Sequence, residues 1–373
     1  MDVANASANA TANVPPASTE GIFLASSALF IMALIPIFIG SFRSTKKSKD
    51  EDIEVVTSND AATFPIFASV ALFGIYLVFK YVPKEYVNFL LNLHFSIIGF
   101  ISMARLLGPM FRFCIPGFLK THRFEFDFTR SVEKEKKEDS WEVLDKVSIH
   151  FISRDLVGIV IAAGIGFWYF ITRHWIANNC VGMTLSVLAV EFIRLNKFMN
   201  GFLLLGGLFF YDIFWVFGTG VMVSVAKTLE APIKVTFPRD IFESGINGKN
   251  MALLGLGDIV IPGIFVAMLL RFDKSLNRQG KHQYFSVGFV AYIVGLLATF
   301  LVMHAFKAAQ PALLYLVPTC LGAPVAMAWM KGDLQRLLEY RDVPDKEDEK
   351  DCSSKSDANG EPKSSAKADK KRT

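Results

Sequence analysis

Residues 201–224 read GFLLLGGLFFYDIFWVFGTGVMVS, and Asp212 is the single charged residue in this stretch. An apolar run of this length lets one helix cross a hydrocarbon core of about 30 Å. The chain of 373 residues is 52% hydrophobic with a mean hydropathy of +0.37, as expected for a protein built largely of such helices. Eight further stretches share this character, namely 21–42, 62–80, 86–104, 156–172, 175–193, 250–270, 284–306 and 311–330. We therefore predict an all-α polytopic membrane protein with nine transmembrane helices.

The positions of lysine and arginine predict the orientation of these helices. With a lumenal N-terminus, four loops face the cytoplasm, namely 41–60, 104–155, 194–200 and 271–283. These loops carry more Lys and Arg than the segments on the opposite side. The first 20 residues lack the basic segment of a cleaved signal, and Arg43 and Lys46 follow the first span instead. We predict an uncleaved first helix, a lumenal N-terminus and a cytosolic C-terminus.

Both ends of the chain carry short signals that agree with this orientation. Asn5 and Asn9 each begin an Asn-x-Ser/Thr triplet, which is glycosylated only in the lumen, although such triplets also occur unmodified. Lys370 and Lys371 form a dilysine pattern near the C-terminus, which resembles a cytosolic retrieval signal of the endoplasmic reticulum. The sequence thus predicts a multi-pass glycoprotein of the endoplasmic reticulum membrane.

Charge and cysteine usage exclude several classes of function. The net charge is +4, but the basic residues lie at the ends of apolar stretches and in the tail, so nucleic acid is not an expected partner. The four cysteines show no CxxC spacing and the histidines form no HExxH motif. We therefore expect no metal site and no cofactor.

Two acidic residues stand out because each lies inside an apolar span. Asp212 is in the sixth span and Asp258 in the seventh, and neither span contains a basic residue that could neutralise it. An ionisable side chain in a membrane helix is costly, so it usually faces a partner or a water-filled cavity. If the two spans are antiparallel neighbours, both residues lie at similar depths. The sequence therefore predicts that the two carboxyl groups meet.

Two carboxyl groups in contact retain one proton between them, because both cannot ionise cheaply. Such a pair is the acid and base combination of aspartic proteases, in which one member activates water and the other protonates the peptide carbonyl. From these residues alone, two other interpretations stay open. The pair can be a structural hydrogen bond between helices or the proton relay of a transporter.

Three motifs surround these residues in order along the chain. They are Tyr211-Asp212, the Gly-x-Gly-Asp sequence that ends at Asp258, and Pro311-Ala312-Leu313 at the start of the last span. In this combination the chain resembles the intramembrane aspartyl proteases, which include signal peptide peptidase and presenilin. The longer stretches 214–219 and 310–318, together with the lumenal N-terminus, resemble signal peptide peptidase rather than presenilin.

The resemblance covers residues from about 150 to 330 most strongly and implies a function. It implies that Asp212 and Asp258 are catalytic, and that a group of motif residues shapes the active site and binds substrate, namely Tyr211, Gly255, Gly257, Pro311, Ala312 and Leu313. The implied substrates are remnant signal peptides and type II transmembrane helices within the lipid bilayer. A second copy of the chain and quality-control proteins of the endoplasmic reticulum are further candidate partners.

The glycines and prolines of these motifs also have a physical interpretation. Gly206 and Gly207 precede Asp212, and Gly255 and Gly257 precede Asp258, and small residues let helix backbones approach closely. Prolines in the last span leave carbonyls free for an extended substrate, and the loop 225–249 is a candidate for holding that segment, unless it is a plain connector.

The predicted organisation therefore has three parts. Residues 1–20 form a lumenal segment, 21–330 form the transmembrane protease domain with its catalytic core at about 150–330, and 331–373 form a disordered cytosolic tail rich in charged residues. Besides the transporter, a membrane chaperone that binds helices without cutting them is an alternative. Binding that survives loss of either aspartate would favour the chaperone.

Overall fold

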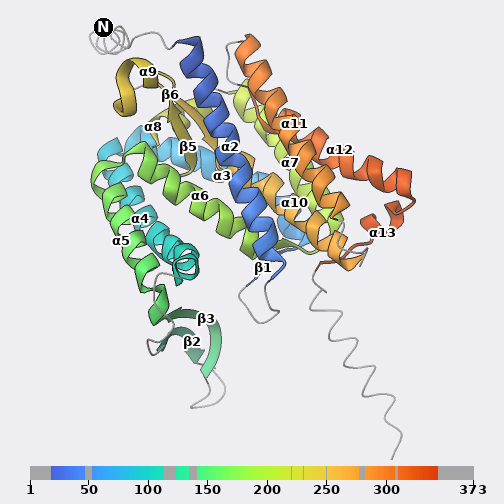
Figure 1. Cartoon of the computed structure of the whole chain (residues 1–373), viewed down its shortest axis with the longest axis horizontal. Coiled ribbons are helices and arrows are strands. Elements are labelled where there is room, and N and C mark those ends of the chain that lie inside the picture. Colours follow the sequence, from blue (N-terminus) through green and yellow to red (C-terminus); the bar gives the residue numbers. More distant parts are fainter. Residues whose placement is uncertain are drawn as a thin grey trace, which may run out of the picture.

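The computed structural model describes residues 18–46, 53–112, 122–133, 141–219, 221–229, 231–248, 250–276, 282–306 and 310–342. The predicted glycosylation residues Asn5 and Asn9 and the predicted retrieval residues Lys370 and Lys371 lie outside these ranges. Within them the protein is mostly helical, and long helices lie side by side along most of its length (Figure 1).

A helix lies at each of the predicted spans. These helices are α2 (Thr19–Ser44), α3 (Ser58–Tyr81), α4 (Lys84–Met110), α5 (Leu156–Thr172), α6 (Trp175–Phe192), α7 (Phe198–Phe217), α10 (Gly257–Ser275), α11 (Gln283–Phe306) and α12 (Leu313–Lys331). Seven of them are long and apolar enough to cross a membrane; α5 is shorter, and α10 carries charged residues near both ends. The all-α polytopic class is confirmed, whereas nine crossings stay a prediction.

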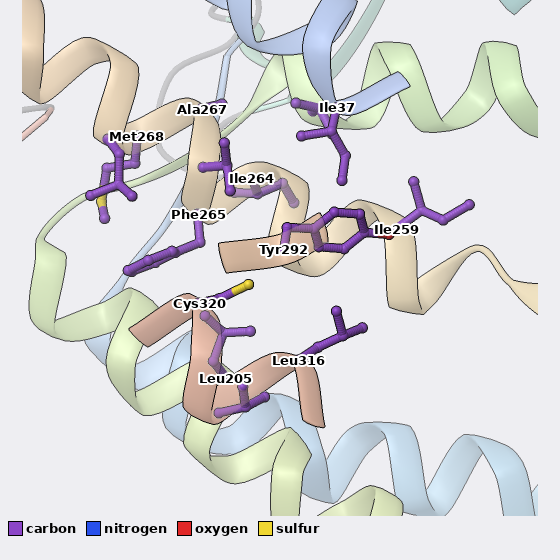
Figure 2. Close-up of a cluster of buried hydrophobic side chains, with 14 of the residues drawn as sticks. Ile37, Leu205, Ile259, Ile264, Phe265, Ala267, Met268, Tyr292, Leu316 and Cys320 are labelled. Atoms are coloured by element: carbon purple, nitrogen blue, oxygen red, sulfur yellow. The ribbon is translucent and has the colours of Figure 1, made fainter. Parts of the chain in front are cut away.

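Helix α10 lies at the centre of the bundle. Every residue from Ile264 to Phe272 is buried, and the helix packs against α2, α6, α7, α11 and α12. Figure 2 shows side chains from these surrounding helices, such as Ile37, Leu205 and Leu316, directed at the α10 residues. By contrast, many large apolar side chains of α2, α3 and α4 are exposed, which suits contact with lipid.

Small residues set how closely the central helices approach. A Cβ atom on Gly263 of α10 would lie 2.8 Å from Val190 Cγ2 of α6, and a Cβ on Gly40 of α2 would lie 2.8 Å from Val190 Cβ. Such distances leave no room for a methyl group at either glycine. Helices α2 and α10 can therefore both pack closely against Val190 of α6.

The described connections between helices contain three two-stranded sheets. Strand β1 (Glu54–Val56) pairs in parallel with β4 (Ile193–Leu195). Strands β2 (Arg123–Glu133) and β3 (Trp141–Ile152) pair antiparallel, and so do β5 (Lys234–Pro238) and β6 (Met251–Gly255). The β5–β6 hairpin lies at the same end of the bundle as the start of α2, and the β2–β3 hairpin lies at the opposite end (Figure 1).

Two predicted span boundaries are wrong, and both flank the candidate site. The sixth span was predicted to reach 224, but α7 ends at Phe217, Gly218 follows it, and a separate short helix α8 occupies Val221–Thr228. The seventh was predicted to begin at 250, but residues 251–255 form β6 and the helix begins at Gly257. The loop predicted at 225–249 contains β5, the helical turn α9 (Ile241–Ser244) and a 3-10 turn at Gly245–Asn247.

The predicted disorder from residue 331 onward is wrong as far as Asp342. Residues Leu334–Leu338 form helix α13, and Leu337 is buried. Beyond this helix the Tyr340 ring packs on Phe272 of α10 at 5.0 Å between centroids. The first residues of the predicted tail therefore pack against the core, although the tail is rich in charged residues. The rest of the predicted tail lies outside the described residues.

Candidate active site

Asp212 lies in the last third of α7 and points into the bundle. Asp212 is only 3% exposed, although the neighbouring Phe210 and Phe214 on the same helix are largely exposed. The carboxylate oxygen Oδ2 accepts a hydrogen bond of 3.0 Å from the backbone N–H of Leu313. Leu313 is the first residue of α12, and the first N–H groups of a helix have no partner within it. The Pro311-Ala312-Leu313 motif therefore meets Asp212 through its backbone.

Asp258 is the second residue of α10 and follows strand β6 almost directly. The sequence had placed it about eight residues inside its helix, which is wrong because the preceding residues are a strand. Its carboxyl group lies near Gly255, where a Cβ atom would be 3.3 Å from Asp258 Oδ2. A larger side chain at position 255 would thus crowd the carboxyl group.

Asp258 lies near enough to Asp212 for a negative charge on Asp212 to act on it. Helices α7 and α10 contact each other, and α12 contacts both, so Asp212 and Asp258 lie on helices that join one another. Two acids in such a place share a proton and can act as acid and base together. Among the described residues, no three His, Cys, Asp or Glu side chains gather into a set that could hold a metal ion.

The glycines before the aspartates have different surroundings from those expected. A Cβ atom on Gly207 would lie 2.7 Å from Pro65 Cγ of α3, so this glycine permits close packing of α7 on α3 rather than on α10. At Gly206 and Gly257 an added Cβ would meet no atom within 4 Å. Close helix approach therefore explains Gly207, while the expectation of such packing at Gly206 and Gly257 is wrong.

The remaining motif residues lie around the pair. Tyr211 is half-buried beside Asp212, with its ring 6.4 Å from that of Trp215 one turn further along α7. Trp215 in turn donates a hydrogen bond of 3.1 Å from Nε1 to Ser69 Oγ of α3. Pro311 and Ala312 precede α12 and are buried with Leu313.

The β5–β6 hairpin is anchored to α6 by two asparagines. Asn179 donates from Nδ2 to the carbonyl of Thr236 at 2.6 Å and accepts from the Thr236 N–H at 2.9 Å. Asn178 donates to the carbonyl of Lys234 at 2.8 Å. The outer edge of β5 is thus occupied by side-chain amides, which mimic the hydrogen bonds of a neighbouring strand.

The outer edge of β6 has no partner strand among the described residues. Leu256 donates a hydrogen bond to the carbonyl of Ile233, and the carbonyl of Asn250 accepts one from Arg239. The even-numbered residues from 250 to 256 therefore direct their backbone groups toward β5. In an antiparallel pair the intervening residues point their N–H and C=O groups outward. On β6 these are Met251, Leu253 and Gly255, and no described strand pairs with them.

Sequence reasoning missed the role of Asn179 and of the hairpin. The detectable signal was a pair of asparagines inside an apolar span, since amides in a membrane helix are expected to find polar partners. The strand itself gave no signal, because the sequence MALLG at 251–255 is as apolar as the helix that follows it.

The chain is similar to known proteins over most of its length. Residues 47–344 match the family described as signal peptide peptidase. The chain is 45% identical to mouse signal peptide peptidase over 348 residues, which cover 92% of this chain and 90% of that protein. It is 46% identical to human signal peptide peptidase, covering 88% and 86%, and 35% identical to intramembrane protease 2 of Caenorhabditis elegans, covering 89% and 95%.

Proposed function

This chain belongs to the signal peptide peptidase family and is an intramembrane aspartic protease, and we propose that Asp212 and Asp258 are its catalytic pair. The observation that carries this proposal is the place of two acids where α7, α10 and α12 contact one another, with Asp212 held by the first N–H of α12. A pair held in this way suits peptide hydrolysis, which needs an acid and a base on either side of one carbonyl group.

The residues have separable tasks in the proposed reaction. The ionised member of the pair takes a proton from water, and the resulting nucleophile attacks the peptide carbonyl while the protonated member donates to its oxygen. The carboxyl that received the proton from water then protonates the amide nitrogen as the C–N bond breaks. The other carboxylate takes back a proton from the gem-diol, which becomes the carboxylic acid product. The Leu313 N–H occupies Oδ2 of Asp212, so it fixes the plane of that carboxyl and leaves the other oxygen for water or Asp258.

The hairpin supplies a place for the substrate. Within a transmembrane helix each amide is bonded internally and shielded, so the helix must open before water can attack it. An opened segment can pair with the outward N–H and C=O groups of Leu253 and Gly255 as an added strand. Because Asp258 follows Gly255 by three residues, a segment on this edge lies next to the carboxyl pair. Tyr211, Gly257, Pro311 and Ala312 would shape the space around it.

The substrates that we propose are remnant signal peptides and the anchors of type II membrane proteins. The names of the mouse and human relatives support the first of these. The protein is a multi-pass membrane protein, and its location in the endoplasmic reticulum is proposed from the dilysine residues Lys370 and Lys371.

The orientation and partners belong to the same proposal. A lumenal N-terminus glycosylated at Asn5 and Asn9, nine crossings and a cytosolic C-terminus agree with the distribution of Lys and Arg. Self-association and binding to quality-control proteins are proposed as further properties of the chain.

The test is cleavage of a signal-peptide-like helix by the purified protein in detergent, with the products identified by mass spectrometry. Asp212→Asn and Asp258→Asn should each abolish cleavage within the apolar segment. Asp60→Asn is a matched control, because Asp60 is an exposed acid that caps the start of α3 through Thr57. Substrate binding without cleavage by the folded wild type would support the chaperone alternative, and ion flux that depends on both aspartates would support the transporter.

A further inference from the structure

Helix α10 has an interruption in its first turn, next to the proposed catalytic residue. In a regular helix the carbonyl of Asp258 would accept a hydrogen bond from the N–H of the residue four positions later. That residue is Pro262, which lies inside α10 and has no N–H. The backbone carbonyl of Asp258 therefore lacks the donor that a regular helix would supply four residues later.

The missing donor comes from a neighbouring helix. The hydroxyl group of Tyr292 on α11 donates to the Asp258 carbonyl at 3.3 Å. Tyr292 is fully buried, and Figure 2 shows its ring lying against α10 near Ile259, above Leu316 and Cys320 of α12. A buried phenol needs a hydrogen-bond partner, and so does the carbonyl that Pro262 leaves free.

The position of Tyr292 is fixed on both sides by glycines of the same helix face. Four residues before it, a Cβ atom on Gly288 would lie 2.5 Å from Leu269 Cδ1 of α10. Three residues after it, a Cβ atom on Gly295 would lie 3.1 Å from the Cα atom of Leu316 on α12. Helix α11 is thus packed closely against both neighbours at this depth, and the tyrosine ring has little freedom to move away from Asp258.

We propose that Tyr292 is a positioning residue for Asp258, which replaces the hydrogen bond that Pro262 removes from the first turn of α10. The inference rests on the proposed catalytic role of Asp258. The first turn of a helix that follows a strand is held weakly, because its hydrogen-bonding pattern is only beginning there. A bond from a rigid neighbour to the carbonyl of Asp258 holds the backbone from which the carboxyl group projects.

The experiment is a double-mutant cycle on purified full-length protein in detergent, with kcat and KM measured on one signal-peptide-like helix. Tyr292→Phe removes only the hydroxyl group, and Pro262→Ala restores the N–H that the Asp258 carbonyl would otherwise use. We expect Tyr292→Phe to lower kcat about 10-fold with KM within about twofold, because a buried bond near the reacting atoms is lost. In the Pro262→Ala background the same substitution should change kcat by less than about twofold.

A matched control lies on the same helix. The hydroxyl of Tyr284, which is equally buried, donates to Asp333 Oδ2 at 3.0 Å far from the catalytic pair. Tyr284→Phe should lower thermal stability to a similar extent but leave kcat within about twofold of wild type. If it lowers kcat as much as Tyr292→Phe does, the effect is general loosening of α11 and the inference falls.

Two further outcomes separate this inference from the proposed function. Cleavage that persists in Asp258→Asn overturns the catalytic role itself. An inactive Asp258→Asn together with an unchanged kcat in Tyr292→Phe, or an equal loss in both backgrounds of the cycle, overturns the positioning role alone. If Tyr292→Phe yields little folded protein, the yield of the double variant with Pro262→Ala decides. A recovered yield supports replacement of the Tyr292 hydroxyl by the restored N–H at position 262, and an equally low yield contradicts it.

Discussion

Asp342 forms a buried ion pair with Arg271 near the end of α10 opposite to Asp258, and we predict that Asp342→Ala strongly destabilises the protein. Arg271 Nε lies 2.7 Å from Asp342 Oδ2, and the two side chains are 7% and 4% exposed. Arg271 Nη1 also donates to Ser44 Oγ of α2 at 2.9 Å. Asp342 accepts a second bond from the Tyr340 hydroxyl, and its N–H donates to the carbonyl of Asn196.

The size of the effect follows from what Asp342→Ala leaves behind. Arg271 would then keep only the hydrogen bond from Nη1 to Ser44. Its Nη2 already has no hydrogen-bond partner among the described residues. A second cation is close, and burial together with the charge of Arg271 lowers the pKa of Arg194. Removing one member of a buried pair costs about 3–5 kcal/mol, because the other charge remains buried. For a protein of this size we expect the midpoint of thermal unfolding to fall by on the order of 10 °C.

The assay is thermal unfolding in detergent, with loss of the monodisperse protein peak as a second measure. A chain that ends at Asp342 should unfold like the full chain, whereas one that ends at Glu339 should be destabilised as strongly as Asp342→Ala. Replacing both partners, as in Arg271→Met with Asp342→Leu, should recover most of the loss, because no unpaired charge is left. A shift below about 2 °C for Asp342→Ala, or a double variant as unstable as the single one, would refute the reasoning.

Two further predictions concern the hairpin and the contact between α3 and α7. Asn179→Ala should lower kcat/KM about 10-fold in the cleavage assay, because it removes two of the three side-chain hydrogen bonds at the edge of β5. Asn178→Ala should have a smaller effect, because it removes the third bond alone. Equal effects of the two substitutions would contradict this reasoning. Gly207→Ala should destabilise the protein by about 1–3 kcal/mol in thermal unfolding, because its Cβ would press on Pro65, while Gly206→Ala should be neutral or stabilising by up to about 1 kcal/mol.

The helices could be predicted from the sequence where length and apolarity decide the outcome. The stretches 156–172 and 284–306 were placed within a residue of α5 and α11, because a membrane helix needs no tertiary partner to satisfy its backbone. The same criterion failed around the site. An apolar strand such as β6 has the same hydropathy as a helix, so residues 250–256 were assigned to α10. The Gly255 and Gly257 pair was the available sign of a break.

Contacts between distant segments could not be predicted from single residues. Asp212 and Asp258 were identified because charges in apolar spans are costly, and Leu313 was identified only through the family resemblance. Pro262 and Tyr292 each look ordinary alone, and their connection needs the packing of α11 on α10. The order of residues 331–342 was missed for a similar reason, since Tyr340 and Asp342 are polar by composition and are buried only because Phe272 and Arg271 receive them.

Helix α10 is less apolar than a lipid-exposed span, and most of its charged residues have partners inside the protein. Three of its four charges have a structural use or a place in the proposed chemistry. Asp258 belongs to the proposed catalytic pair, and Arg271 binds Asp342. Asp273 accepts hydrogen bonds from the N–H groups of Tyr284 and Phe285 and so caps the start of α11. Because α10 is buried on all sides, it has no lipid-facing surface that would require apolar residues along its whole length. It is therefore free to carry ionic groups at both ends, one serving the proposed chemistry and the others fixing the helix from which that chemistry is presented.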